Sequence, residues 1–409
     1  MNEEKLIPHL FRTEYRKIVT VLCNTFGLQY IETAEDIASD TFLQASETWG
    51  IKGLPENPAA WLYTVAKNKA KNYLKRDKIL SDKIIPQIKY NSAPTAEPEI
   101  DWSDENIHDS QLKMMFAVCH PSIAAEAQVA LALRILCGFG IDEIASAFLT
   151  NKETINKRLF RAKEKLRAEN IVAELPLPDE IQNRLDTVLR TLYLLYNEGY
   201  YASQNENVLR KELCSEAMRL TFLLTENERT NLPQVNALLA LMSFHASRFD
   251  ARLNEKGELI LYDEQDETLW NKELIHQGEH FLQQASQGNQ LTRYHLEAAI
   301  AYWHTNKEDT KEKWEGILQL YNELLILEYS PIVALNRTYA LSKANSVEEA
   351  ITEAEKLNLS QNHLYHTLLG ELYKHANKGK AALHFSSALK LARTAEDKQL
   401  IERKLQALN

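Results

Sequence analysis

Basic and amide side chains concentrate between residues 152 and 167, at a spacing that suits contact with nucleic acid. Seven lysines and arginines stand there against two acids. Asparagine can pair with adenine through two hydrogen bonds and arginine or lysine with guanine, whereas other cations contact phosphates. Asn156, Lys157 and Arg161 are therefore predicted to read bases, and Arg158 and Lys163 to contact phosphates. The candidate DNA-contacting residues of this stretch are Lys152, Thr154, Asn156, Lys157, Arg158, Phe160, Arg161 and Lys163.

A second basic stretch combines cations with aromatic rings. From Lys67 to Lys78 there are six lysines and arginines and one acid, and two aromatic residues, Trp61 and Tyr63, precede them. Unpaired bases stack on rings while lysines follow phosphates, so this combination suits single-stranded DNA. Trp61 could equally be a core residue, so the lysines and asparagines rank above it. The candidates are Trp61, Lys67, Asn68, Lys69, Asn72, Lys75 and Arg76.

An acidic stripe precedes the second stretch, in the segment AEDIASDTFLQASETW (residues 34–49). At helical spacing its carboxylates project opposite an apolar face, and such a surface suits docking of a basic partner helix. The candidate partner-binding residues are Asp36, Ile37, Asp40, Phe42 and Glu47.

The overall charge of the chain opposes this interpretation, because the formal net charge is -10 and nucleic-acid binding depends on neutralised phosphates. The distribution of charged residues along the chain is more informative than the net charge. Two basic stretches on an otherwise acidic chain confine DNA contact to particular surfaces. Each stretch could instead be only the solvated face of an amphipathic helix, an alternative that the charge pattern leaves open.

Signatures of catalysis and metal binding are absent from the sequence. It contains no HExxH, GxxxxGK[ST], GxSxG or GxGxxG, its four cysteines are scattered without a CxxC pair, and its histidines lack ligand spacing. We therefore expect no enzymatic activity, no cofactor and no metal. No run of about 18 uncharged apolar residues occurs and the first residues do not resemble a signal peptide, so we expect a cytoplasmic protein without a membrane partner.

The elements that position these residues are predicted to be helices. Asp142 and Glu143 open one helix, a short polar turn follows, and Ile155 and Leu159 anchor a second helix whose other face is basic. This pattern is typical of a helix-turn-helix, in which the second helix enters the major groove. An ordinary helical hairpin is the alternative. Further upstream, Thr33 and the acid three residues later predict a helix start near Ala34, and Asn57 before a proline predicts another.

Prolines and composition divide the chain into parts. Residues 1–80 have helical spacing, 81–106 read as an exposed linker, 107–170 are helical again, and 180–409 contain successive helices. The segment 252–262, RLNEKGELILY, is an exception that could form a short β-hairpin. The fold class predicted is all-α, with two small helical domains followed by an α-solenoid-like extension.

The end of the extension has a repeat signal. Residues 364–391 resemble a tetratricopeptide repeat, with two helices, small residues where they cross and Gly379 in the turn between them. Residues 332–357 show the same pattern of helix, turn and helix. Because repeats bury their faces against neighbours, we expect a stacked array.

These segments together resemble a known family. The stretch 135–167 looks like the fourth conserved region of sigma-70 family factors, and residues 34–49 and 57–76 resemble the second region of the small extracytoplasmic-function members, in the family's order. The resemblance implies a transcription initiation factor. Its partners would be core RNA polymerase, whose clamp coiled coil would contact residues 34–49, and promoter DNA, read at the minus-35 element and melted at the minus-10 element.

The extension resembles that of a long-tailed subgroup of these factors, which includes a similar Asn-Glu-Gly-Tyr segment. In that subgroup the tail is thought to replace a dedicated anti-sigma factor, so the resemblance implies regulation through an intramolecular or protein partner of the repeats. Asn197, Glu198 and Gly199 fit a helix cap better than a ligand site. The alternative function is a helix-turn-helix regulator that binds DNA without polymerase, although such a protein would not need the acidic segment 34–49.

Overall fold

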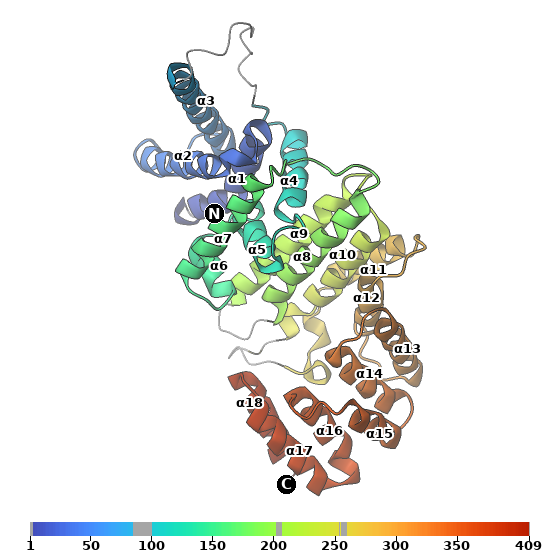
Figure 1. The fold of residues 1–409 in the computed structure, drawn as a ribbon. Helices are drawn as coiled ribbons and strands as arrows, with labels where there is room; N and C mark the ends of the chain where they lie inside the picture. The colour runs from blue at the N-terminus through green and yellow to red at the C-terminus, as the bar shows by residue number, and fades with distance from the viewer. Residues whose placement is uncertain (1–2, 85–99, 202–206, 253, 255–259, 409) are drawn as a thin grey trace. The chain divides into compact units, whose positions relative to one another are not determined.

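The computed structural model describes residues 3–84, 100–201, 207–252, 254 and 260–408. All regular structure in these ranges is helical, with no strand, which confirms the all-α prediction (Figure 1). The chain forms two compact units, Met1–Gly199 and Tyr200–Asn409.

The first part of unit 1 consists of α1 (Glu3–Phe26), the 3-10 turn Leu28–Tyr30, α2 (Ile31–Lys52) and α3 (Pro58–Ile84), which pack on one another. Gly27, with φ of 96°, lets the chain leave α1 and turn directly into α2. The side-chain oxygen of Asn57 accepts the backbone N–H of Ala60 at 3.0 Å, which confirms the predicted start of α3.

The helix start predicted near Ala34 was wrong. The 3-10 turn continues into α2 without a break, so this helix already begins at the fully buried Ile31. The hydroxyl of Thr33 does not cap a helix but donates to the hydroxyl of Tyr73 in α3 at 3.3 Å. The Thr33 side chain, which the local pattern predicted to cap a helix, therefore makes a tertiary contact instead.

The rest of unit 1 contains α4 (Asp104–Val118), α5 (Ala125–Leu131) with its π-helical continuation Ala132–Leu136, α6 (Ile141–Ala147), α7 (Lys152–Ala168) and most of α8 (Ile181–Tyr201). Two polar contacts, one partly and one fully buried, connect α8 to the rest of this unit. Arg184 donates to the carbonyl oxygen of Phe116 at 2.8 Å, and the hydroxyl of Thr191 donates to Gln128 at 2.9 Å. Most of α8, the first helix of the predicted extension 180–409, therefore belongs to unit 1.

Unit 2 is built from antiparallel helix pairs in succession. Its helices are α9 (Asn207–Thr225), α10 (Pro233–Ala246), α11 (Lys272–Ala285), α12 (Arg293–Trp303), α13 (Lys311–Leu327), α14 (Pro331–Ala344), α15 (Val347–Leu357), α16 (His363–Ala376), α17 (Lys378–Leu391) and α18 (Ala395–Gln406). Each of these helices packs on the next, and α10 also contacts α12 while α14 contacts α16. Contacts between near neighbours in sequence are typical of a helical repeat array.

Glycines let aromatic rings fill the crossings of these helices. A Cβ on Gly278 in α11 would lie 2.5 Å from the ring of Phe244 in α10, and one on Gly370 in α16 would lie 2.6 Å from the ring of Phe385 in α17. The placement of Gly379 in a turn was wrong, because α17 begins at Lys378 and the side chain of Asn377 caps it. Asparagine, which accepts the orphaned N–H groups of a helix start, makes the turn here.

One further prediction concerns the extension, and another concerns the whole chain. The possible hairpin at 252–262 falls partly outside the described residues, which omit 253 and 255–259; the described Ile260 N–H donates to the Arg252 carbonyl oxygen at 2.8 Å. No helix in the described ranges has the length and apolar character to span a membrane.

Candidate nucleic-acid interface

The predicted pair of supporting and recognition helices corresponds to α6 and α7, joined by residues 148–151. The Glu143 carboxylate accepts the backbone N–H of Gly140 at 2.8 Å at the start of α6, and the Asn151 side chain accepts that of Thr154 at 2.8 Å at the start of α7. Ile144 and Ile155 are completely buried between the helices. Local capping and a small apolar core thus orient the outer face of α7.

The predicted base-reading residues occupy that outer face. Asn156, Lys157 and Arg161 are all exposed, as is the nearby Phe160, whose side chain is 59% exposed. Within the described residues no carboxylate lies at ion-pair distance from Arg161. The arrangement leaves amide and guanidinium donors directed to solvent, as contact with base edges requires.

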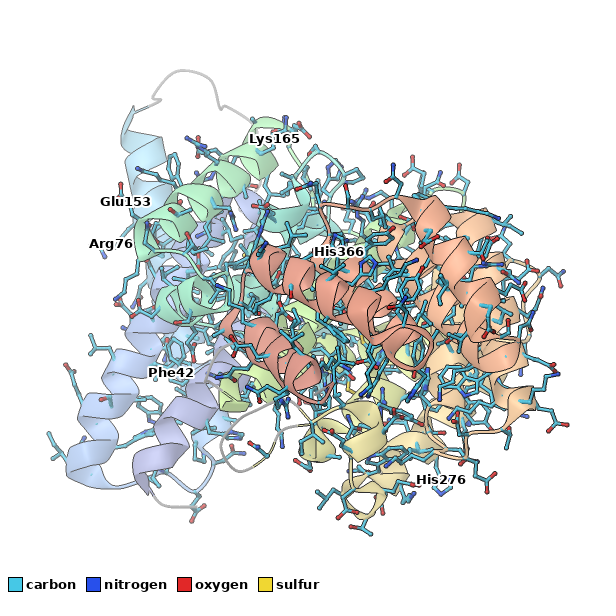
Figure 2. All side chains as sticks on the ribbon, turned by 90° about the horizontal axis from the view of Figure 1, so that it is seen from below. Phe42, Arg76, Glu153, Lys165, His276 and His366 are labelled. Atoms are coloured by element: carbon cyan, nitrogen blue, oxygen red, sulfur yellow. The ribbon has the colours of Figure 1, made fainter. Side chains whose placement is uncertain are left out.

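Two lysines of the same helix pair with acids close to its start. Lys157 contacts Glu153 at 2.6 Å and Lys152 contacts Asp142 at 2.6 Å, and all four side chains are well exposed. Exposed pairs of this kind contribute about 0 to 1 kcal/mol, so a phosphate could replace either carboxylate. Glu153 and Lys165 mark opposite ends of α7 in Figure 2.

The two cations predicted to contact phosphates are engaged within unit 1. Arg158 pairs with Glu126 at 2.7 Å and lies over the ring of Phe148 at 5.1 Å. The ammonium of Lys163 forms an ion pair with Glu35 of α2, and its side chain is only 12% exposed. Sequence spacing alone could not show that Lys163 faces another part of the molecule, because the acid that binds it is 128 positions away.

The second basic stretch lies on α3. Asn68, Asn72, Lys75 and Arg76 are exposed, while Lys67 and Lys69 are half-buried. The Nζ atom of Lys69 lies 3.9 Å from a carboxylate oxygen of Asp40 on α2. The outer face of α3 is therefore polar and cationic over about three helical turns, and Figure 2 shows Arg76 projecting from it.

The aromatic residues at the start of α3 have different environments. Trp61 is half-buried and packs edge to face on Trp49 with ring centroids 5.3 Å apart, so it can still offer part of its ring to solvent. Tyr63 stacks on Trp102 at 4.8 Å and donates to the carboxylate of Glu14. Burial and that carboxylate raise the pKa of Tyr63. Tyr63 thus has a structural role in joining α3 to α1 and to the segment before α4.

The acidic stripe of α2 has the predicted orientation. Asp36, Asp40 and Glu47 are exposed, whereas Ile37 and Phe42 are buried at 6% and 4% exposure. Partial burial and then the neighbouring carboxylates, that of Glu35 first, raise the pKa of Asp36. The two apolar residues therefore support the stripe from behind.

Leu43 is a residue of this stripe that the sequence analysis missed. It is 59% exposed and lies on the same helical face as Asp36, Asp40 and Glu47, at steps of four, three and four residues. An exposed leucine surrounded by acids resembles the apolar centre and polar rim of a docking surface. Helical spacing would have found it had apolar residues within the acidic face been considered.

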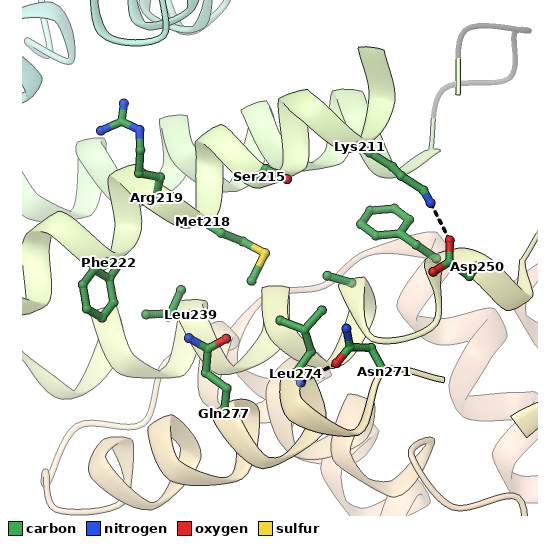
Figure 3. Close-up of a pocket in the computed structure, with 12 residues that line it drawn as sticks. Lys211, Ser215, Met218, Arg219, Phe222, Leu239, Asp250, Asn271, Leu274 and Gln277 are labelled. Atoms are coloured by element: carbon green, nitrogen blue, oxygen red, sulfur yellow. Dashed lines mark hydrogen bonds and ion pairs between the residues drawn. The ribbon is translucent and has the colours of Figure 1, made fainter. Parts of the chain in front are cut away.

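Unit 2 contains a pocket of about 460 Å³ between α9, α10 and α11. Figure 3 shows Met218, Leu239 and Leu274 on its apolar wall. At one end Lys211 pairs with Asp250, and Asn271 accepts the backbone N–H of Leu274 at 3.0 Å. These polar groups therefore already have partners inside the protein.

No group of three or more histidine, cysteine or acidic side chains that could hold a metal ion occurs in the ranges that the structure describes. All four cysteines are buried. Burial raises the pKa of the Cys119 thiol to about 12, so this thiol stays protonated and unreactive at neutral pH.

Comparison with known proteins assigns two segments to families. Residues 10–79, which contain α2 and most of α3, match sigma-70 region 2. Residues 184–286 match a family of unknown function, DUF6596. Uncharacterized protein R00370 of Rhizobium meliloti (strain 1021) is 32% identical over 384 residues, which cover 92% of this chain and 90% of that protein. No solved structure matches the chain.

The fold and the region 2 match define the class of this protein. It is all-helical and has the N-terminal domain of a sigma-70 family factor, and sigma-70 family factors are non-enzymatic transcription initiation factors. The 32% sequence identity over nearly the whole length then shows that the chain belongs to the same family as the Rhizobium meliloti protein. Such a domain implies binding to core RNA polymerase and promoter DNA.

Proposed function

We propose that this protein binds core RNA polymerase in the cytoplasm and directs it to specific promoters. The observation that carries the proposal is the stripe Asp36, Asp40, Leu43 and Glu47, exposed on α2 inside the segment that matches sigma-70 region 2. Acids around an exposed leucine fit a basic partner helix such as the clamp coiled coil of polymerase. Polymerase supplies the catalysis, and the factor supplies promoter choice.

The outer face of α3 would bind the separated strand at the minus-10 element. Its amides and cations, from Asn68 to Arg76, suit backbone and base contacts, and the half-exposed Trp61 offers a stacking surface. Tyr63 is excluded from this role because its ring and hydroxyl have partners within unit 1.

The α7 helix would read the minus-35 element as the second helix of a helix-turn-helix. Supporting this, Asn156, Lys157 and Arg161 are exposed on one face while Ile155 and Leu159 anchor the opposite face. The pairing of Lys163 with Glu35 favours contact to DNA through the first half of α7 rather than through its second half.

The extension would regulate this activity, as in the long-tailed extracytoplasmic-function subgroup that the sequence resembles. The stacking of α13 to α17 and the glycine and aromatic crossings support a tetratricopeptide-like array that receives an intramolecular or protein partner. Run-off transcription with and without the extension decides whether the array restrains or assists the basic faces of unit 1.

The test is run-off transcription with core RNA polymerase on promoters from the protein's own genome. The full chain is compared with a chain that ends after Tyr201, because α8 completes unit 1 through Arg184 and Thr191. Transcription that depends on the added protein is the expected result, and the comparison gives the sign of the extension's effect. Promoter binding without polymerase binding would instead favour a DNA-binding regulator that acts alone.

A further inference from the structure

Arg248, which follows the end of α10 in unit 2, carries a charge that no described acid neutralises. Its side chain is half-buried, and its Nε atom is fully buried without a hydrogen-bond partner. No carboxylate in the described ranges lies at ion-pair distance from its guanidinium, whose carbon atom lies 5.4 Å from the centre of the Tyr262 ring. Taking a guanidinium out of water without a counter-charge is unfavourable. Arg248 therefore has the environment of a residue that binds an anion.

Polar atoms without a partner gather around Arg248 and are not spread over unit 2. Six buried side-chain atoms lack a hydrogen bond in the described part of unit 2, and five of them belong to this region: His245 Nδ1, Arg248 Nε, Gln265 Oε1, Trp270 Nε1 and His304 Nδ1. Buried polar groups are normally hydrogen-bonded, so such a concentration indicates a binding site.

Ring contacts and charges show that these groups are neighbours. The centroid of the Tyr262 ring lies 5.1 Å from that of His304 and 6.1 Å from that of Trp270. Burial first, and then the charges of Arg248, Arg252 and His304, lower the pKa of His245. The imidazoles, the indole and the guanidinium thus lie in one region, although they come from different helices and turns.

Lys313 of α13 adds a second buried positive charge. Its side chain is 3% exposed, and its Nζ atom donates to the Tyr262 hydroxyl at 3.2 Å and to the Asn306 carbonyl oxygen. Burial lowers the pKa of Lys313 more than the nearby carboxylates, that of Asp309 first, raise it. Asp309 itself pairs with Lys343 at 3.0 Å. Both acceptors of the Lys313 ammonium are neutral, and an ammonium has a third N–H to donate.

The tyrosine of the Asn-Glu-Gly-Tyr segment, Tyr200, lies on one side of this region. Its ring centroid is 4.7 Å from that of His245 and 3.7 Å from the guanidinium carbon of Arg252, which also donates to the Tyr200 carbonyl oxygen at 3.2 Å. Tyr200, His245, Arg248, Arg252 and Trp270 all lie in the segment that matches DUF6596. The contacts of Tyr200 thus position His245 and Arg252 beside Arg248.

Bound water would satisfy the N–H groups of this region but not its charge. Water molecules often accept hydrogen bonds from buried donors, yet they are neutral. Burial and then the charges of Arg248 and Lys313 lower the pKa of His304 to about 3, so its imidazole stays uncharged beside these cations. An oxyanion supplies both the acceptor atoms and the negative charge.

We propose that Arg248 and Lys313, with the N–H groups of His245, Trp270 and His304, form a phosphate cluster that binds the phosphate group of a small molecule. The planar guanidinium of Arg248 pairs with two oxygens, and the other donors need further oxygens, which a carboxylate lacks. The ligand is small because the donor atoms are buried. Such a ligand gives the extension a chemical signal, which goes beyond the proposed function and does not depend on it.

Calorimetric titration of the full chain with inorganic phosphate, in a buffer without other oxyanions, tests the phosphate cluster. The unchanged protein should bind phosphate saturably, and its melting temperature should rise with phosphate concentration. Arg248→Gln should weaken binding by about tenfold or more, and Arg248→Lys should also weaken it because lysine keeps the charge without the planar fork. Arg403→Gln, at an exposed position of α18, is the control and should bind normally. No saturable binding to the unchanged protein would overturn the proposal.

Stability in phosphate-free buffer separates a ligand-binding arginine from a structural one. Because Arg248 carries a charge without a counter-charge, Arg248→Gln should be at least as stable as the unchanged protein there, and phosphate should not stabilise it. A large loss of stability with unchanged phosphate affinity would make Arg248 structural and overturn the proposal. If Arg248→Gln does not fold, Trp270→Phe removes the indole N–H while keeping a ring, and unchanged phosphate binding in that variant would be equally decisive against the cluster.

Comparison of three ligands identifies the chemistry that the cluster binds. Tighter binding of inorganic phosphate than of phenyl phosphate would identify free phosphate as the source, and the reverse would identify a phosphorylated small molecule. Acetate that binds as tightly as phosphate would overturn the assignment to a phosphate group. Phosphate binding by a protein that supports no run-off transcription would overturn the proposed function and keep the cluster, whereas transcription without phosphate binding would do the opposite.

Discussion

Gly138 lies against the backbone of Arg12, so closely that a Cβ on residue 138 would be 2.8 Å from the Arg12 carbonyl oxygen. Gly138 also has φ of 74°, in the left-handed region that glycine adopts without strain. The absence of a side chain therefore lets the loop before α6 meet α1 directly. This approach brings Phe139 under the Arg12 guanidinium and Arg134 within reach of Tyr15.

Gly138→Ala should destabilise unit 1 through both the backbone angle and the Arg12 contact. The left-handed conformation costs a non-glycine residue about 1 to 2 kcal/mol. The control Gly53→Ala has φ of 81° but no atom within 4 Å of the new Cβ, so it should cost only this strain. Because of the clash, the free energy of unfolding should fall by about 1 to 3 kcal/mol more in Gly138→Ala than in Gly53→Ala. Urea unfolding and amide hydrogen exchange of α1 measure this difference. Equal losses would mean that the loop moves away from α1 at little cost.

Arg161→Ala should weaken binding to promoter duplex more than any charge change outside the interface. Arg161 is exposed on the predicted reading face of α7, and loss of a base contact costs about 1 to 3 kcal/mol. Fluorescence anisotropy with a duplex containing the minus-35 element should show the loss, with reduced discrimination against altered sequences.

The control for that variant is Lys390→Ala, which removes an exposed positive charge from α17 in unit 2. It should leave both affinity and sequence preference unchanged. If Arg161→Ala behaves like Lys390→Ala, the reading face of α7 has been placed wrongly.

The elements of unit 1 could be predicted from the sequence because their signals are local. Asn57 before a proline, Asp142 and Glu143 at a helix start, and the spacing of Ile155 and Leu159 all depend on neighbours within one or two turns. The exposed positions of Asp36 and Arg161 follow from the same periodicity, because a 3.6-residue repeat assigns faces whenever one side is apolar.

The contacts between distant segments could not be predicted in this way. Nothing near Lys163 or Arg134 in the sequence indicates that both bind Glu35, and Thr33 has the type and position of a cap although it bonds to Tyr73. Pairing across about a hundred residues depends on how whole helices pack, which helical periodicity does not encode.

Leu43→Ala should reduce affinity for core RNA polymerase without affecting stability. Its side chain is 59% exposed in free unit 1, so truncation removes little internal packing but about 1 to 2 kcal/mol of apolar burial at a docked surface. Leu383→Ala, at a 70% exposed position of α17, is the matched control. Titration of labelled polymerase should show weaker binding for Leu43→Ala alone. Equal affinities would remove Leu43 from the polymerase-binding surface.

Unit 2 should lose stability as the pH falls below about 6.5, in part through His304. Desolvation lowers the pKa of His304 from its ordinary 6.5 to about 3, with additional lowering by the nearby charges of Arg248 and Lys313. Tyr262 and Trp314 pack edge to face on the ring at centroid distances of 5.1 Å and 5.9 Å. The folded state therefore holds this imidazole neutral where the unfolded chain would protonate it.

The sign of the effect follows from proton linkage. Between about pH 6.5 and pH 3 the unfolded state binds more protons at His304 than the folded state, so the free energy of unfolding falls as the pH is lowered through this window. His304→Gln removes that titration, and the melting temperature should then decline less steeply from pH 7 to pH 5. His276→Gln, at an exposed position of α11, serves as control and should keep the original slope. An unchanged slope in His304→Gln would show that other groups, such as the buried His245, account for the acid sensitivity of unit 2.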